Sequence, residues 1–246
     1  MTDPEKIFAG KKALIVGGTG GIGREIAIAL AKENAEVTVH GGSSEERLKK
    51  TISRLKEAGC PDAKGFLHLI EGPSSAEIIL KQSPNPDILI CAWGPFERTA
   101  LENTGASSWE KMALYNLAFP GALVSLVIQG MMERNYGRIL LFGGTNTDTI
   151  RGFTTTAAYS APKTAVGVIA KSAAKICGSK NVNCNVICPG LTDTEYLDEN
   201  AKSYNSERSP GKKPINAEKI ARLAVTVLAN PEINGAIIPI DRGIVL

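Results

Sequence analysis

The sequence predicts an α/β fold of three layers, in which a doubly wound parallel sheet of about seven strands lies between two layers of helices. Short segments that are apolar throughout alternate with longer helical stretches along the whole chain. Strands that are apolar on both faces are typical of a parallel sheet that helices cover on both sides. The 246 residues show no internal repeat, low-complexity tract or linker, so residues 1–246 are predicted to form one domain.

The first half of the chain is predicted to contain four strand–helix units. The apolar run Ala13-Leu14-Ile15-Val16 ends in a glycine cluster, and an amphipathic stretch follows at 22–33, so this unit is a strand, a tight turn and a helix. The same alternation predicts strands at 36–40, 65–70 and 87–92, and helices at 44–58 (rich in charge), 76–82 (short) and 109–134 (long).

The second half continues the alternation with longer helices. Strands are predicted at 138–142, 182–188 and 236–240, and helices at 156–178 and 217–229. A polar, turn-rich segment at 195–214 separates the sixth strand from the last helix. The order of elements therefore predicts right-handed crossovers and helices on both faces of one sheet.

Composition and charge exclude several classes of protein. Hydrophobic residues make up 43% and charged residues 22% of the chain, as in ordinary globular proteins. The net charge of +3 is small, and the basic pairs are isolated, so we expect neither a nucleic acid nor a membrane as partner. The first residues lack the apolar core of a signal peptide, and the apolar stretch at 118–128 is too short to span a bilayer.

The five cysteines predict free thiols. Their number is odd and their positions are scattered, so they do not form a disulfide framework. Cys184 and Cys188 share one side of a strand, but no histidine or second cysteine pair completes a metal site, and no metal is expected. Buried thiols of this kind indicate a reducing compartment, so we expect the protein in the cytoplasm.

The turn after the first strand predicts a dinucleotide site. Gly18, Gly20 and Gly23 fit the spacing GxGxxG, and Gly17, Gly21 and Gly23 fit GxxxGxG. Glycines let the backbone turn tightly, and a side chain there would hold a pyrophosphate away from the exposed N–H groups and the helix dipole. The position of the turn between a strand and a helix strengthens the prediction.

The end of the second strand favours NADP over NAD. An acidic residue there would bind the ribose 2′-hydroxyl and repel a 2′-phosphate, but the chain reads His40-Gly41-Gly42-Ser43-Ser44 and has no carboxylate before Glu45. Ser43, Ser44 and His40 are candidate partners of the 2′-phosphate. No arginine is found at the expected position.

Tyr159 and Lys163 form a candidate acid–base pair. They are four residues apart near the start of a long predicted helix, so both face one side, one turn apart. An ammonium beside a phenol favours the phenolate, so we expect Lys163 to lower the pKa of Tyr159. Taken alone, this pair has a plainer interpretation, in which an exposed lysine passes a surface tyrosine.

Together these motifs resemble the compact, single-domain short-chain dehydrogenase/reductase family, whose fold is of the Rossmann type. The resemblance runs from Lys11 to the C-terminus. Within the family, the arrangement of motifs is similar to that of the 3-oxoacyl-carrier-protein reductases. The motifs occur in the order of the family: the glycine turn, Asn116, Tyr159 with Lys163, residues 189–194 and the closing segment at 234–243.

The resemblance implies a role for each matching residue. Tyr159 would exchange a proton with the substrate oxygen, Lys163 would assist it and bind the nicotinamide ribose, and Asn116 would hold a water in a proton relay. The residues implied to contact the cofactor are Gly17, Gly21, Ile22, Gly23, Ser43, Ala92, Gly94, Tyr159, Lys163, Pro189, Gly190, Thr192 and Thr194.

Two stretches depart from the family pattern in the dinucleotide half. Val16 replaces the threonine whose hydroxyl braces the glycine turn. Cys91-Ala92-Trp93-Gly94 replaces Asn-Asn-Ala-Gly, which removes two amides and places a bulky ring beside the cofactor or over its adenosine end.

The most serious departure concerns the catalytic serine that follows the fifth strand. Counting along that strand places the position at Gly144, whereas counting back thirteen residues from Tyr159 places it at Asn146, so the loop at 144–158 carries a small insertion. We expect Thr145, or the amide of Asn146, to act in place of the serine; Thr147 and Thr149 are weaker candidates. Without a donor to the developing oxyanion, turnover would fall about a hundred-fold.

The predicted function is therefore an NADP(H)-dependent oxidoreductase that acts on a small or carrier-bound carbonyl substrate, with a 3-oxoacyl-carrier-protein reductase as one candidate. Lys212, Lys213 and Arg134 are candidate contacts for an acidic carrier. The alternative is a dinucleotide-binding subunit that has lost catalysis. An epimerase relative is disfavoured because no separate C-terminal substrate domain is predicted. Apolar residues on more than one face of the two long helices predict a homodimer or homotetramer.

Overall fold

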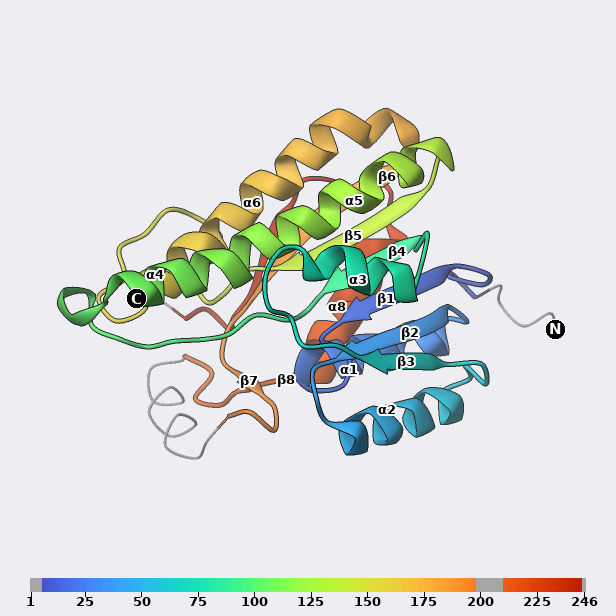
Figure 1. The fold of residues 1–246 in the computed structure, drawn as a ribbon, viewed down its shortest axis with the longest axis horizontal. Coiled ribbons are helices and arrows are strands. Elements are labelled where there is room, and N and C mark those ends of the chain that lie inside the picture. The colour runs from blue at the N-terminus through green and yellow to red at the C-terminus, as the bar shows by residue number, and fades with distance from the viewer. Residues whose placement is uncertain (1–5, 198–209, 245–246) are drawn as a thin grey trace.

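In the computed structural model, which describes residues 6–197 and 210–244, the predicted fold is confirmed. Seven parallel strands form one sheet in the order β3-β2-β1-β4-β5-β6-β9 (Figure 1). The strands are β1 (Lys12–Val16), β2 (Glu36–Gly41), β3 (Lys64–Leu67), β4 (Ile88–Cys91), β5 (Gly137–Phe142), β6 (Val182–Pro189) and β9 (Ile237–Ile240).

Helices cover both faces of the sheet. The helix α1 (Gly21–Lys32) packs against α2 (Glu45–Glu57) and α8 (Ala217–Ala229) on one face. The other face carries α3 (Ser75–Gln82), α4 (Ala106–Ala113), α5 (Phe119–Glu133) and α6 (Ala157–Cys177). Alternate residues of β1 serve the two resulting cores, because Ile15 faces α1 and α8 whereas Leu14 and Val16 face α5 and α6.

The long helix that the sequence predicts at 109–134 begins earlier and is not uniform. It starts with α4 at Ala106, passes through a π-helical turn at Leu114–Ala118 and continues as α5. Short 3₁₀ turns at Leu101–Asn103 and Gly178–Lys180 complete the described helical segments. Such π turns are rare and are frequent at functional sites, and this one carries Asn116.

Two further differences concern strands. The third strand ends at Leu67 rather than at residue 70. A pair of short strands, β7 (Thr192–Asp193) and β8 (Ile215–Asn216), forms a separate two-stranded ladder that the sequence does not predict. Most of the polar segment predicted at 195–214 lies outside the described residues, except 195–197 and 210–214.

One helical run, Ala106–Glu133, is long and apolar enough to cross a membrane by length and composition alone. It packs on the sheet as a core helix, with Phe119 and Leu123 fully buried. All five cysteines are free and buried, as predicted. Among the described residues, no group of three or more metal-ligating side chains is close enough together to hold a metal ion.

Candidate functional site

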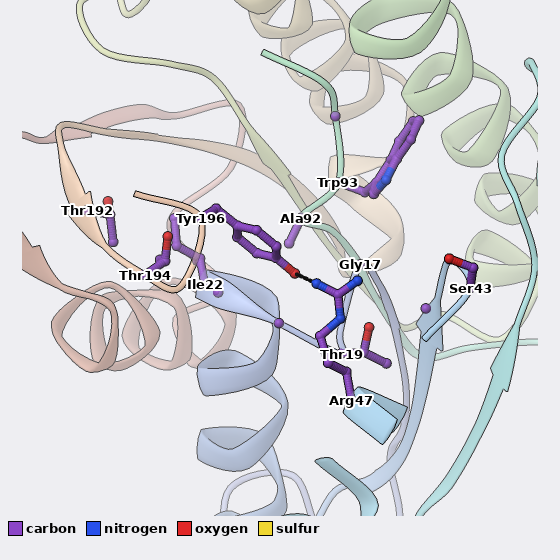
Figure 2. A pocket seen from close by; sticks show the side chains of 15 residues that line it. Gly17, Thr19, Ile22, Ser43, Arg47, Ala92, Trp93, Thr192, Thr194 and Tyr196 are labelled. Atoms are coloured by element: carbon purple, nitrogen blue, oxygen red, sulfur yellow. Dashed lines mark hydrogen bonds between the residues drawn. The ribbon is translucent and has the colours of Figure 1, made fainter. Parts of the chain in front are cut away.

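The carboxyl ends of β1, β2 and β4 surround a pocket of about 450 Å³ (Figure 2). The strand order reverses at β1, because β2 and β3 extend the sheet on one side and β4 on the other. Open α/β sheets bind ligands at this point. The pocket is lined by Gly17, Thr19, Gly20, Gly21, Ile22, Gly41, Gly42, Ser43, Arg47, Ala92, Trp93, Gly94, Thr192, Thr194 and Tyr196.

The glycine turn forms the floor of the pocket. Gly17 has a φ of +79°, and a Cβ atom there would lie 3.0 Å from the carbonyl oxygen of Ala92. Gly21, the first residue of α1, also has a positive φ and directs its N–H out of the helix end. Gly23 does not line the pocket; it packs against the backbone of Gly17 and brings the helix close to the turn. The cradle fits a pyrophosphate because glycine backbone, without side chains, forms it.

The far end of the pocket carries a cation that the sequence argument missed. Arg47 lies in the first turn of α2 and lines the pocket together with Ser43. No arginine stands at the expected position in the sequence, but Arg47 lines this end of the pocket from α2. Ser44, one of the predicted phosphate partners, instead caps α2 by accepting a hydrogen bond from the backbone N–H of Arg47 at 3.3 Å.

Tyr159 and Lys163 lie one turn apart on α6 and do not themselves line the pocket. The Lys163 Nζ lies 5.9 Å from the centroid of the Tyr159 ring and donates a hydrogen bond to the carbonyl oxygen of Phe142 at 3.0 Å. A Cβ atom on Gly94, which lines the pocket, would lie 3.3 Å from the same Nζ. Lys163 therefore lies next to Gly94, which lines the pocket.

The pKa of Tyr159 is raised, whereas the sequence predicts that Lys163 lowers it. Burial, followed by the nearby Cys188 thiol, raises the pKa of Tyr159 to about 12. Burial also lowers the pKa of Lys163 to about 8. The expected lowering of the tyrosine pKa is wrong in this structure, because the ammonium is desolvated and its hydrogen bond goes to the Phe142 carbonyl rather than to the phenol.

Asn116 is fully buried in the π-helical turn, and its side chain lies beside Gly94, as the Lys163 ammonium does. Its Nδ2 donates to the carbonyl oxygen of Pro95 at 3.1 Å, and its amide fills the space beside Gly94. Its Oδ1 is buried and has no hydrogen-bond partner within the described part of the chain. Buried amide oxygens are usually hydrogen-bonded, and a water or a bound molecule would serve as the donor here.

A family model described as short chain dehydrogenase matches residues 11–205 of this chain. The chain belongs to the short-chain dehydrogenase family. The match covers the glycine turn and Gly94, which line the pocket, and also Asn116 and Lys163, which lie beside Gly94.

Individual short-chain dehydrogenases resemble the chain over nearly its whole length. An uncharacterized oxidoreductase, YvaG of Bacillus subtilis, is 31% identical over 96% of both chains. The 3-oxoacyl-[acyl-carrier-protein] reductase FabG of Escherichia coli is 29% identical over 92% of both. Among solved structures, a variant of the actinorhodin polyketide ketoreductase with NADPH superposes with a TM-score of 0.82, at 25% identity, over 95% of this chain and 97% of that one.

Gly144, one of the two positions that counting offers for the family's serine, lies against the ring of Tyr159. A Cβ atom on Gly144 would lie 2.9 Å from Cε1 and 3.1 Å from the hydroxyl of Tyr159. The phenol therefore takes up space into which a serine side chain would project.

The predicted substitutes for this serine have other partners. The Thr145 hydroxyl donates to the carbonyl oxygen of Pro189 at 3.2 Å, and Thr147 exchanges hydrogen bonds with the backbone of Gly144. Thr149 accepts a hydrogen bond from exposed Arg151. Asn146 differs, because its Nδ2 is buried without a partner in the described chain and its backbone is left-handed, with a φ of 59°. Asn146 therefore holds a free donor two residues from Gly144.

His40 braces the glycine turn and is not a phosphate ligand. It is 1% exposed; its Nδ1 accepts a hydrogen bond from the N–H of Gly17 at 3.4 Å, and its Nε2 lies 2.8 Å from the carbonyl oxygen of His68. The prediction that His40 binds phosphate is wrong, because both ring nitrogens are already used inside the fold. The ring replaces the brace that the family's threonine, here Val16, would give.

The remaining predicted contacts divide into lining and supporting residues. Ala92 and Gly94 line the pocket, as do Thr192 and Thr194. Trp93 also lines it and packs edge-on against Tyr115 and Phe119, with centroid separations of 5.5 and 5.8 Å.

Three other predicted contacts lie outside the pocket. Pro189 ends β6, and Gly190 packs against Asp241, so both support the pocket without lining it. Arg134, a candidate carrier contact, pairs with Asp87 at 3.6 Å at the opposite end of the sheet.

Two other residues at the site escaped the sequence argument. Phe96 packs edge-on against Tyr159 with 4.9 Å between ring centroids, although 59% of its surface is exposed. Glu195 reaches the N-terminus of α1, where its Oε1 accepts hydrogen bonds from the N–H of Gly21 and the guanidinium of Arg24. No local motif marks either residue, since each contact joins segments that are distant along the chain.

Proposed function

We propose that this short-chain dehydrogenase is an NADP(H)-dependent oxidoreductase that transfers a hydride between the nicotinamide and a carbonyl or alcohol carbon. The observation that carries the proposal is one continuous site. The bare glycine turn fits a pyrophosphate, Ser43 and Arg47 lie where a 2′-phosphate would need partners, and Lys163 contacts the space beside Gly94 at the other end.

The preference for NADP rests on charge. Among the described residues that line the pocket near the end of β2 there is no carboxylate, and Arg47 offers a guanidinium suited to a phosphate. Ser43 is exposed at the same end and supplies a hydroxyl. The resemblance to an actinorhodin ketoreductase solved with NADPH supports the same cofactor. Binding of NADH much more tightly than NADPH in a titration would contradict it.

The bound cofactor would supply the hydride, and the chain would supply the proton and the geometry. Since the pKa of Tyr159 is about 12, the phenol carries its proton at neutral pH and is ready to protonate a carbonyl oxygen as the carbon is reduced. Lys163 lies beside the phenol and would hold the ribose hydroxyls. Asn116 directs an unpaired oxygen into the same region and would hold a water that returns the proton to Tyr159.

Asn146 is the strongest candidate for the donor to the reacting oxygen, with Thr145 second. The Nδ2 of Asn146 has no partner among the described residues, whereas the Thr145 hydroxyl would have to leave the carbonyl oxygen of Pro189. Removing one such donor typically slows an enzyme about a hundred- to a thousand-fold. Asn146→Ala should therefore slow reduction more than Thr145→Val does.

The substrate would be a small or carrier-bound carbonyl compound. Similarity to FabG of E. coli at 29% identity supports a 3-oxoacyl thioester as the first compound to test. The free, buried cysteines fit a cytoplasmic location. We further propose a homodimer or homotetramer, because apolar side chains remain exposed on the outer helices.

The test is to add 3-oxoacyl thioesters and a panel of simple ketones to the protein with NADPH and to follow loss of NADPH absorbance. Tyr159→Phe should reduce the rate at least about a hundred-fold while NADPH still binds. A Tyr159→Phe variant that reduces the substrate at the wild-type rate would rule out the proposed mechanism.

One observation favours a second function. Neither Gly144 nor Asn146, the two positions that counting offers for the family's serine, carries a hydroxyl, and among the described residues no hydroxyl is hydrogen-bonded to Tyr159. A cofactor-binding subunit without catalysis is consistent with this. Tight NADPH binding without consumption across the whole substrate panel would select that function.

A further inference from the structure

The segment after β7 places two of the chain's own side chains against the glycine turn: Tyr196 lines the pocket, and Glu195 lines the neighbouring hollow at the start of α1. Glu195 accepts a hydrogen bond from the Gly21 N–H at 3.2 Å and is held by the two terminal nitrogens of Arg24 at 2.8 and 3.4 Å. Gly20, the residue before α1, has no side chain to cap the helix. The carboxylate therefore serves as the anion at the positive end of α1.

Tyr196 covers the adjoining part of the pocket. A Cβ atom on Gly20 would lie 3.0 Å from Cζ of Tyr196, and one on Gly21 would lie 3.3 Å from its Cε2, so the ring lies directly on the glycine turn. Its hydroxyl accepts a hydrogen bond from Arg47 at 3.2 Å (Figure 2). The cation that would receive a 2′-phosphate is therefore already engaged.

We propose that Glu195 and Tyr196 form a plug that occupies the phosphate positions of the pocket, and that these residues set both the affinity for the cofactor and the preference for NADPH over NADH. This rests on the proposed function, because it assumes that the pocket takes a dinucleotide. NADPH must break two internal contacts in order to bind. Its pyrophosphate must replace Glu195 at the N–H of Gly21, and its 2′-phosphate must replace the Tyr196 hydroxyl at Arg47. NADH lacks the second anion and gains nothing from Arg47.

The charge on Glu195 is consistent with this role. Burial would raise the pKa of its carboxyl, but hydrogen bonds from backbone N–H groups, including that of Gly21, and the ion pair with Arg24 outweigh burial and lower it. The carboxylate is thus ionised at neutral pH and competes directly with phosphate. A ligand that must displace an internal group binds more weakly than it would to a vacant site. Its apparent affinity is the intrinsic affinity multiplied by the fraction of molecules in which that group has moved away.

The experiment measures binding by calorimetry on the full chain, with inorganic pyrophosphate, NADPH and NADH as ligands. Glu195→Ala should bind all three about three- to ten-fold more tightly than the wild type, since it removes a half-exposed, charge-assisted contact. Glu195→Gln, which keeps a neutral acceptor, should give a smaller gain. Tyr196→Phe should strengthen binding of NADPH but leave NADH almost unchanged, because only the 2′-phosphate needs Arg47.

Two control variants match these substitutions. Glu218→Gln removes a carboxylate from the same neighbouring hollow that Glu195 lines. Tyr115→Phe removes a phenol hydroxyl that donates to the Glu71 carbonyl and not to Arg47. Both should bind like the wild type. Unchanged or weaker binding by Glu195→Ala would overturn the plug.

The pyrophosphate arm separates the plug from the proposed function. If no variant binds either nicotinamide cofactor, the proposed function fails. Tighter pyrophosphate binding by Glu195→Ala would still support the plug in that case, and absence of pyrophosphate binding in every variant would overturn it.

Discussion

The imidazole of His40 replaces a threonine hydroxyl as the brace of the glycine turn, and it does so only while neutral. Its Nδ1 must accept a hydrogen bond from Gly17, which a protonated ring cannot do. Burial lowers the pKa of His40 to about 4, from about 6.5 in the unfolded chain. The unfolded chain therefore binds more protons between these values, so the folded state loses stability as the pH falls from 6.5 to 4.

We predict a loss of up to about 3 kcal/mol over this pH range, measured by urea unfolding. His40→Gln should remove most of this pH dependence because it cannot titrate. The chain has one other histidine, and His68→Gln should keep the dependence, since His40 and the backbone carbonyl at position 68 remain. If the free energy of unfolding depends on pH equally in the wild type and in His40→Gln, the His40 imidazole does not cause the loss of stability.

Lys163 shows the cost in stability of burying a cation inside a fold. It is 6% exposed, and burial lowers its pKa to about 8 from an ordinary value of 10.5. Lys163→Met should therefore be more stable than the wild type at pH 7, by up to about 3 kcal/mol, while hydride transfer falls sharply. Between pH 8 and 10.5 the unfolded wild type binds more protons than the folded one, so wild-type stability rises and the gap narrows.

Unfolding curves at pH 7 and at about pH 10 test this prediction. A gap that widens toward the higher pH would contradict it, as would a Lys163→Met variant less stable than the wild type at neutral pH.

The loop between β5 and α6 leaves no room for a side chain at Gly144. Because a Cβ atom at Gly144 would press on Tyr159, restoring the family residue with Gly144→Ser should not restore activity. We predict a loss of about 1–3 kcal/mol of stability, typical of overpacking, together with a slower reaction as the phenol is displaced. Gly152→Ser is the matched control in the same loop, since no heavy atom lies within 4 Å of a Cβ there. A faster Gly144→Ser enzyme would instead mean that the loop tolerates the original chemistry.

Elements differ in how far their sequence reveals them. The unit from β1 to α1 could be predicted in detail, because an apolar run, a glycine turn and an amphipathic stretch are all local signals. The π turn at Asn116 could not, since nothing in its residues distinguishes it from an α-helix. The Thr145 hydroxyl could be proposed as a substitute from its position, but its partner, the Pro189 carbonyl, lies 44 residues away.

The same limit applies to charges in the site. Arg47 meets Tyr196 across 149 residues, and Glu195 meets Gly21 across 174, so only the folded chain shows that these pairs share one pocket. The pKa of Tyr159 depends on burial, and a spacing of four residues to Lys163 carries no information about burial. Motif spacing therefore located the site, whereas three-dimensional packing determined its electrostatics.

At the scale of the whole molecule, α4, α5 and α6 pack on the sheet with one side and leave their outer side exposed. The helices α5 and α6 pack side by side (Figure 1), and their inner residues Leu123, Val127 and Val166 are buried as part of the core. On the outer side, Leu126 is 47% and Val168 is 67% exposed. Exposed apolar residues on adjacent helices favour a subunit interface, and a second copy of this chain is the simplest partner.

We predict that Val168→Glu will dissociate the oligomer, because a buried unpaired carboxylate at a symmetric contact occurs twice and costs several kcal/mol each time. Light scattering after size-exclusion chromatography should give an oligomer for the wild type and a smaller species for the variant. Ile7→Glu, at a position 55% exposed near the N-terminus, should leave the mass unchanged. A wild-type protein that is already monomeric at the same concentration would refute the interface. If the variant dissociates yet binds NADPH normally, each subunit carries a complete cofactor pocket.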